Sequence, residues 1–163
     1  MPGQLRPYNF RLARDADAEA LSQICRLAIA EIGPHKYSAK QIAAWLARAP
    51  TPARFRERLA QHHQIFVAAD GEDHPVAYAL LEADGHLDHL YGHPQHSRQG
   101  LAGRLLAMAQ DHARSQNMNR LYTEASELAK SAFERAGYTV TARRDFVIEG
   151  VAIHNYAMEK PLI

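Results

Sequence analysis

The residues His86-Leu-Asp-His-Leu-Tyr-Gly-His-Pro-Gln-His-Ser-Arg-Gln-Gly-Leu-Ala-Gly-Arg-Leu-Leu106 decide the fold of this chain. Residues 86–91 predict a strand, and the Gly92-His-Pro94 segment that follows predicts a turn. A long helix is expected from about Gly100 to Ser115, because apolar residues recur there at helical spacing. A strand, a tight turn and the start of a helix therefore meet within one short segment.

Small residues stand at the start of this predicted helix, at Gly100, Ala102 and Gly103. They let a ligand approach the backbone closely, and the N–H groups at a helix start attract an anion. A pyrophosphate would fit such a cradle, with Arg98 and Arg104 as charged neighbours. The spacing matches neither a P-loop nor a dinucleotide fingerprint, and small residues that merely permit a tight turn explain it equally well.

Length and composition describe one soluble globular domain, with 163 residues of which 47% are hydrophobic and 23% charged. The net charge of +1 argues against a nucleic-acid or anionic-membrane partner, because such partners need an excess of Lys and Arg. The single cysteine, Cys25, falls on an apolar helix stripe and is expected in the core. The longest apolar run, residues 76–81, is too short to span a bilayer. We expect a single cytoplasmic domain over residues 1–163, with residues 1–7 as a loose tail.

The order of the predicted elements defines the fold class. Strands are expected at 10–13, 64–69, 75–82, 86–91, 121–125, 138–148 and 151–158. Helices are expected at 15–32 with Asp15 as N-cap, from the capping box at Ser38, at 51–59, at 100–115 and at 127–135. This order predicts an α+β fold: a mixed, mostly antiparallel sheet of six to seven strands with helices on both faces.

The chain resembles the GNAT N-acetyltransferase superfamily along almost its whole length. The family signature R/Q-x-x-G-x-G/A corresponds to Ser97–Ala102, and a second family landmark matches Ala125-Ser126 and Phe133–Tyr138. Three further motifs resemble a YafP-like bacterial branch of the family, at residues 37–45, 84–91 and 150–161. The fold expected from this resemblance is the same mixed sheet.

The resemblance implies acetyl-CoA as cosubstrate. It places the pantetheine arm beside Leu90-Tyr91-Gly92, with a backbone N–H near Leu90 or Tyr91 holding the thioester oxygen. Ser126 takes the position where many members have an Asn that binds the pantetheine. The pyrophosphate is expected on the N–H groups of Arg98, Gln99, Gly100, Leu101, Ala102 and Gly103.

The sequence departs from the family pattern at four positions. Ser97 replaces the usual Arg or Gln, Arg98 replaces a frequent Gly, and Gly92 replaces a usual Val. Phe133 stands beside the cofactor where many members have the Tyr that protonates the leaving thiolate, and Phe cannot donate a proton. Tyr138 is the candidate substitute for this acid, with Tyr91 and Tyr156 as alternatives.

A base is also needed, because a protonated amine must lose a proton before it attacks. Glu82, Asp88, His89 and Glu124 all lie on strands expected near the opening between the strands at 86–91 and 121–125. Asp88 and Glu82 are the preferred catalytic pair, although a structural or solvated role is the alternative for each. Tyr37 and Trp45 could line an acceptor pocket, and simple packing is the alternative for both.

Four of the ten histidines lie in one segment, at positions 86, 89, 93 and 96. Residues 86 and 89 fall on opposite faces of a strand and 93–96 cross a turn, so convergence on a metal is not expected.

The resulting hypothesis is an acetyl-CoA-dependent N-acetyltransferase that acts on a small-molecule or peptide primary amine by direct transfer in a ternary complex. The alternatives are a CoA-binding module with little or no activity and, less favoured, a histidine-based metal hydrolase. No nucleic-acid or membrane partner is expected, and a homodimer is possible.

Overall fold

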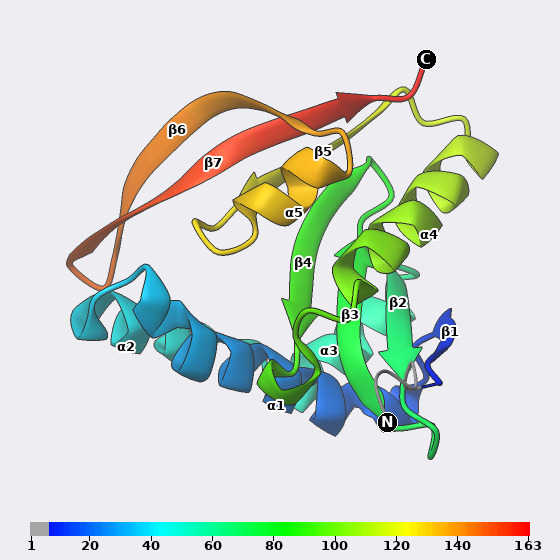
Figure 1. Ribbon diagram of the computed structural model, residues 1–163, viewed down its shortest axis with the longest axis horizontal. Coiled ribbons are helices and arrows are strands. Elements are labelled where there is room, and N and C mark those ends of the chain that lie inside the picture. The colour runs from blue at the N-terminus through cyan, green and yellow to red at the C-terminus, as the bar shows by residue number, and fades with distance from the viewer. Residues whose placement is uncertain (1–6) are drawn as a thin grey trace, which may run out of the picture.

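A single seven-stranded sheet, in the order β1-β2-β3-β4-β5-β7-β6, organises the structure (Figure 1). The computed structural model describes residues 7–163, so that most of the expected loose tail lies outside the described residues. Neighbouring strands are antiparallel except for β4 and β5, which are parallel. The strands are β1 (Asn9–Leu12), β2 (Gln64–Ala69), β3 (Pro75–Leu81), β4 (His86–Gly92), β5 (Arg120–Ala125), β6 (Thr139–Ile148) and β7 (Val151–Pro161).

Five α-helices in the described part of the chain cover the two faces of the sheet. They are α1 (Ala18–Leu27), α2 (Ala39–Ala47), α3 (Pro52–Ala60), α4 (Leu101–Ser115) and α5 (Lys130–Arg135). Short helical turns occur at Asp15–Asp17, Ala28–Ile32, Gly33–His35 and Pro94–His96. The predicted α+β class, with a mostly antiparallel sheet and helices on both faces, is confirmed.

The alternation of side chains along the strands builds two separate cores. In β2, Phe66 and Ala68 pack on the face covered by α4 and α5, whereas Ile65 and Val67 pack on the face covered by α1, α2 and α3. Cys25 belongs to the second core and is 1% exposed, which confirms its expected place. The sheet is thus buried on both sides around its central strands.

The two helix starts predicted from a capping side chain, at Ser38 and Thr51, are confirmed. Ser38 Oγ accepts a hydrogen bond from the N–H of Gln41 at 3.2 Å, and Ser38 N–H donates to Gln41 Oε1 at 2.9 Å, as the capping box predicts. Thr51 Oγ1 likewise accepts from the N–H of Arg54 and caps α3.

Two predicted helix starts are wrong, each for a tertiary reason. Asp15 begins a 3-10 turn and is not the N-cap, because Asp17 accepts from the N–H of Arg14 at 2.7 Å and pairs with Arg11 at 2.7 Å. The helix expected at Glu127 begins at Lys130. Glu127 instead donates its N–H to the Tyr37 hydroxyl at 2.8 Å and binds His154 through its carboxylate, which holds this segment as a turn.

The parallel contact between β4 and β5 is short, and the strands separate beyond it. They pair at His86 with Tyr122 and at Leu87 with Thr123. Thr123 Oγ1 also donates to the Leu87 carbonyl at 2.7 Å. On the other side of β4 the register with β3 shifts, since Leu80 pairs with His89 and Leu81 with Leu87. Asp88 is therefore the extra residue of a β-bulge at the point where β4 leaves β5.

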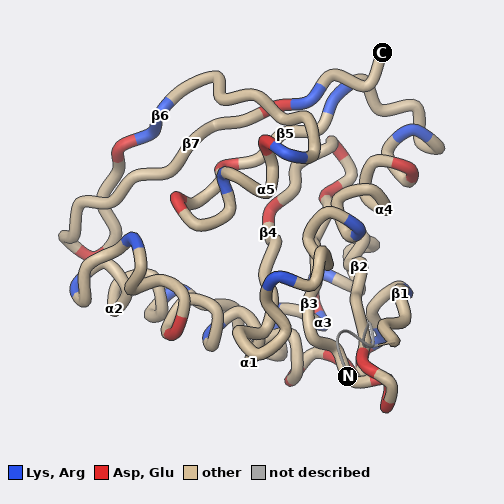
Figure 2. Tube along the Cα trace, in the orientation of Figure 1, with Lys and Arg blue, Asp and Glu red and all other residues tan. Residues whose placement is uncertain are grey.

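Charges of both signs are interspersed along the chain, without a long run of either (Figure 2). No helix within residues 7–163 is long and apolar enough to cross a membrane.

We expect Gly85→Ala to destabilise the β4–β5 contact. Gly85 has φ +99°, and a Cβ there would lie 2.5 Å from the Arg120 carbonyl oxygen at the start of β5. The free energy of unfolding, measured in urea, should fall by roughly 2 to 4 kcal/mol. Gly71→Ala is the matched control, because its Cβ would meet nothing within 4 Å, and it should change stability by less than about 0.5 kcal/mol. Equal stability of the two variants would contradict the expected strain.

Candidate active site

Two cavities meet where β4 and β5 separate. The larger has a volume of about 400 Å³ and the smaller about 140 Å³. Both are lined by Trp45, Leu90, Tyr91, Ser126 and Ala129. A molecule in the larger cavity can therefore present one end to the smaller cavity.

The larger cavity brings together most residues predicted to bind the cofactor. The ten that line it are Leu90, Tyr91, Gly92, Arg98, Gln99, Gly100, Leu101, Ala102, Gly103 and Ser126. The eleventh, Phe133, lines the smaller cavity instead. Arg135, at the end of α5, also lines the larger cavity and was missed, because its approach to the start of α4 depends on tertiary packing.

The backbone at the start of α4 forms an open cradle on the wall of this cavity. Gly100, with φ +74°, is the left-handed residue just before the helix, and Arg98 also has a positive φ of 61°. The first N–H groups of α4 have no partner within the helix. A Cβ on Gly103 would meet nothing within 4 Å, so space remains in front of the backbone. These features fit a pyrophosphate group.

Arg104, the second arginine considered as a phosphate neighbour, does not line the larger cavity. Its guanidinium lies over the ring of Phe10, 3.8 Å from the ring centroid, in a cation–π contact. The side chain of Arg104 thus stabilises the packing of β1 against α4.

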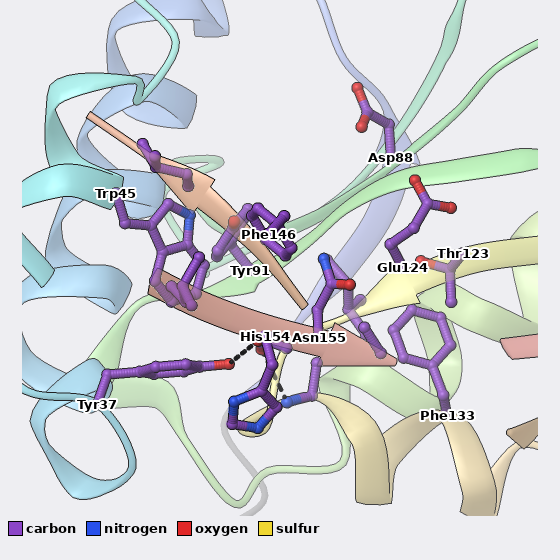
Figure 3. A pocket seen from close by; sticks show the side chains of 16 residues that line it. Tyr37, Trp45, Asp88, Tyr91, Thr123, Glu124, Phe133, Phe146, His154 and Asn155 are labelled. Atoms are coloured by element: carbon purple, nitrogen blue, oxygen red, sulfur yellow. Dashed lines mark hydrogen bonds between the residues drawn. The ribbon is translucent and has the colours of Figure 1, made fainter. Parts of the chain in front are cut away.

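The smaller cavity has an acidic side and an aromatic side. Figure 3 shows Asp88 and Glu124 together on one side, with Trp45 and Tyr37 across from them. Phe146 of β6 also lines the wall. Among the described residues, no Lys or Arg lines this cavity.

Tyr37 and Trp45, expected either to line a pocket or to pack, do both. Tyr37 is 6% exposed, and its hydroxyl accepts from Glu127 N–H at 2.8 Å and donates to the His154 carbonyl at 3.3 Å. Trp45 meets Tyr37 edge to face with ring centroids 5.4 Å apart. The aromatic wall is therefore held in place by its own contacts.

Asp88 is held as an anion at the edge of the smaller cavity. Its Oδ2 accepts a hydrogen bond from Arg58 Nη1 at 2.9 Å, and the Arg58 side chain is 8% exposed. Burial alone would raise the pKa of Asp88, but the electrostatic effect of His89 and the contact with Arg58 outweigh it and lower the pKa below its usual value. A carboxylate with a lowered pKa is a better anchor for a cation than a proton acceptor.

Glu82 and Glu124 are joined by His86, which lies between them. His86 Nδ1 is 2.5 Å from Glu82 Oε1, and its Nε2 is 3.0 Å from Glu124 Oε1. Burial lowers the pKa of His86, but hydrogen bonds to Glu124 and Glu82 outweigh it and raise the pKa to about 9. Glu124 lines the smaller cavity, whereas Glu82 does not and reaches it only through His86.

His89, the fourth residue considered as a base, is part of the core. Its Nδ1 lies 2.9 Å from the Tyr78 hydroxyl, and its ring meets Phe55 edge to face at 5.8 Å. Burial lowers the pKa of His89 to about 4, so the ring is neutral at pH 7.

The four histidines of residues 86–96 lie in different environments. His86 and His89 have the partners just described, whereas His93 and His96 line the larger cavity. One group in the described chain, Glu82 with His86 and Asp88, brings possible metal-ligand atoms within 4.8 Å of one another. These side chains already pair with Arg58 and with each other, and the expectation of no metal stays a prediction.

Of the three tyrosines proposed to replace the acid missing at Phe133, Tyr138 and Tyr156 line neither cavity, whereas Tyr91 lines both. Tyr138 is 3% exposed, packs edge to face on Phe133 at 5.0 Å and lines neither cavity. Burial raises the pKa of Tyr138, and within residues 7–163 its hydroxyl has no hydrogen-bond partner. Tyr156 lines neither cavity and packs against Lys130. Tyr91 lines both cavities, and burial raises the pKa of its hydroxyl well above the usual value.

Several solved structures share the fold of this chain. The chain matches a solved GCN5-related N-acetyltransferase from Rhodopseudomonas palustris with 27% identity and a TM-score of 0.86, covering 94% of this chain and 95% of that one. A structure of yncA from Salmonella typhimurium with acetyl-CoA gives 22% identity and a TM-score of 0.73, covering 96% and 94% of the two chains. A phosphinothricin acetyltransferase from Sinorhizobium meliloti with acetyl-CoA gives 16% identity and 0.73, covering 95% and 88%.

A search of curated proteins finds no match. The family model described as an acetyltransferase (GNAT) domain matches residues 34–160, which is most of the chain. With the cradle at the start of α4 and the separation of β4 from β5, this match shows that the chain belongs to the GNAT acetyltransferase family.

Proposed function

We propose that this protein transfers the acetyl group of acetyl-CoA to a primary amine by direct attack in a ternary complex. The observation that carries the proposal is the meeting of the two cavities. The larger cavity, with the start of α4 in its wall, opens beside a smaller cavity that is lined by the carboxylates of Asp88 and Glu124. The two substrates could therefore lie in contact without a covalent enzyme intermediate.

The residues of the larger cavity fit CoA. Backbone N–H groups at the start of α4 would bind the pyrophosphate, and Arg98 and Arg135 would add positive charge near it. The edge of β4 at Leu90–Gly92 would lie along the pantetheine arm, with Ser126 facing it. Acetyl-CoA supplies an activated thioester, from which the acetyl group passes to the amine as a C–N bond forms and the C–S bond breaks.

Asp88 and Glu124 would prepare the amine. Asp88 would hold the ammonium group, because its contact with Arg58 keeps it ionised. Glu124 would accept the proton that the ammonium group must lose before attack. Glu124 thus takes the role that the sequence suggested for Glu82, because Glu124 lines the smaller cavity and Glu82 lies behind His86.

The leaving thiolate would depart without a tyrosine acid. Phe133 lines the smaller cavity at the position where a donor is common, and Tyr138 is buried beside it without access to either cavity. A CoA thiol has a pKa of about 8.5, so the thiolate is a tolerable leaving group near neutral pH. The thiolate would then take its proton from water.

The remaining features of the hypothesis also stay proposals. They are a small-molecule acceptor, a cytoplasmic location, a possible homodimer without nucleic-acid or membrane partners, and a place in the YafP-like branch. A CoA-binding module without activity is the second candidate, and Phe133 is the observation that favours it.

The test of transfer is release of free thiol from acetyl-CoA in the presence of a panel of primary amines. We expect thiol release that depends on the amine, with acetylated amine formed in equal amount by mass spectrometry. Tight CoA binding without amine-dependent thiol release across the panel would instead support the binding module.

A charge at Gly103 should weaken CoA binding without unfolding the protein. Gly103→Glu has open space around it, and a carboxylate in the first turn favours the helix, but it would repel a pyrophosphate. We expect calorimetry to show a Kd for CoA at least about tenfold higher than in the neutral, similarly sized control Gly103→Gln. Equal affinities in the two variants would place the pyrophosphate elsewhere.

The charge on His86 should make stability depend on pH. The folded pKa of about 9 lies above the unfolded value near 6.5, so the stabilisation is complete below about pH 6.5 and is lost as pH rises through 9. The facing groups are Glu82, Glu124 and Asp88, with Tyr122 stacked on the ring.

From pH 6 to pH 9 the wild-type protein should therefore lose roughly 2 kcal/mol more unfolding free energy than His86→Gln, as measured in urea at each pH. Parallel pH profiles of the two proteins would show that His86 is not charged in the folded state.

A further inference from the structure

The side chains that line the smaller cavity indicate what kind of acceptor it could bind, which the fold alone does not. Its ionisable acidic groups, Asp88 and Glu124, lie on one side near the ring of Phe133, and Trp45 and Tyr37 lie across from them (Figure 3). We propose that the acceptor is a primary arylalkylamine without an anionic group, with its ammonium between the two carboxylates and its ring against the aromatic wall. This inference rests on the proposed function and specifies its substrate class.

The acidic side retains capacity to bind an ammonium group. The two nearest partners of Asp88, Arg58 and His89, both contact Oδ2, at 2.9 and 3.6 Å, which leaves Oδ1 for a ligand. Both oxygens of Glu124 contact His86 Nε2, at 3.0 and 3.1 Å. Arg144 Nη1 lies 4.0 Å from Oε1, which is beyond hydrogen-bond distance, so each oxygen keeps a further lone pair. An ammonium group with three N–H donors could therefore bind both carboxylates.

The aromatic side is built for a flat apolar group. Trp45 contacts Tyr37 with ring centroids 5.4 Å apart and Tyr91 with centroids 6.4 Å apart. Phe146 adds a ring from β6, and Ile148 and Ile153 complete an apolar surface. An arene packed on such walls gains burial and edge-to-face contacts that an alkyl chain of equal length gains only in part.

An acceptor with a carboxylate would find no Lys or Arg among the described residues that line this cavity. The two arginines next to the lining already have partners, since Arg58 binds Asp88, and Arg144 donates to Asn155 Oδ1 at 3.3 Å and lies 4.0 Å from Glu124 Oε1. An α-amino acid would bring its carboxylate close to Asp88 and Glu124, where like charges repel. A phosphinothricin-type acceptor, as described for the Sinorhizobium meliloti structure, is therefore not expected here.

A linear polyamine fits the cavity less well because it carries a second positive charge. Its second ammonium group would lie against the aromatic wall. The carboxylate beyond that wall, Glu127, is already bound to His154 Nε2 at 2.5 Å and does not line the cavity. Burial of a charge without a partner is costly, so a single cationic end is favoured.

The experiment compares kcat/KM for 2-phenylethylamine, phenylalanine, ethylamine and spermidine. Phenylalanine differs from 2-phenylethylamine by one carboxylate, and ethylamine lacks the ring. We expect kcat/KM for 2-phenylethylamine to exceed the value for phenylalanine at least a hundredfold and the values for the other two at least tenfold. A preference for phenylalanine or for spermidine would overturn the proposal.

Variants of β6 test the contact with the ring. Phe146→Ala removes a partly exposed side chain that lines only the smaller cavity, and Val147→Ala is the matched control, since Val147 is 62% exposed and lines neither cavity. Phe146→Ala should lower kcat/KM about tenfold more for 2-phenylethylamine than for ethylamine, whereas Val147→Ala should change neither value nor the Kd for CoA. An equal loss for both amines would contradict a ring contact at Phe146.

Binding separates a failure of this inference from a failure of the proposed function. If no amine releases thiol, the transfer activity is refuted, and calorimetric titration of 2-phenylethylamine and phenylalanine into the protein with CoA still tests the acceptor class. Binding of 2-phenylethylamine alone, weakened by Phe146→Ala and not by Val147→Ala, would support the class. Equal or tighter binding of phenylalanine would refute it.

Discussion

The short parallel contact between β4 and β5 is the constraint on which the rest of the structure depends. Backbone pairing joins the strands at His86–Leu87 and Tyr122–Thr123, and the Thr123 hydroxyl adds one bond to the Leu87 carbonyl. Beyond this point the backbone groups of β4 lack β5 as a partner, and the edge that results faces both cavities. A longer parallel pairing would close the cleft, and no pairing would let the two halves of the sheet move apart.

The β-bulge at Asp88 lies at the same point, where β4 separates from β5. An extra residue in β4 turns the strand away from β5 and brings a carboxylate to the edge of the smaller cavity. Arg58, from α3, is buried beside it and holds it ionised. A carboxylate that would be costly to bury alone is thereby kept charged at the edge of the smaller cavity.

The parts of the structure predicted from sequence are those determined by local chemistry. The start of α4 depends on Gly100 and its neighbours, and the start of α2 depends on Ser38 and Gln41 within one turn. The parts missed depend on partners distant in sequence. Glu82 and Glu124 are equally acidic in the sequence, but only the register of β4 against β5 shows that one lies behind His86 and the other lines the cavity.

The two halves of the site therefore differ in how strongly sequence constrains them. The larger cavity presents backbone N–H groups and small residues, and backbone groups remain in place when side chains change. A family match and a TM-score of 0.86 are therefore compatible with only 27% sequence identity. The smaller cavity is assembled from side chains of α2, α5, β4, β5, β6 and β7 and of the segments between them. Those that line only this cavity, such as Asp88 and Phe146, can change without contact with the larger cavity. A shared fold therefore does not transfer the class of acceptor from one member of the family to another.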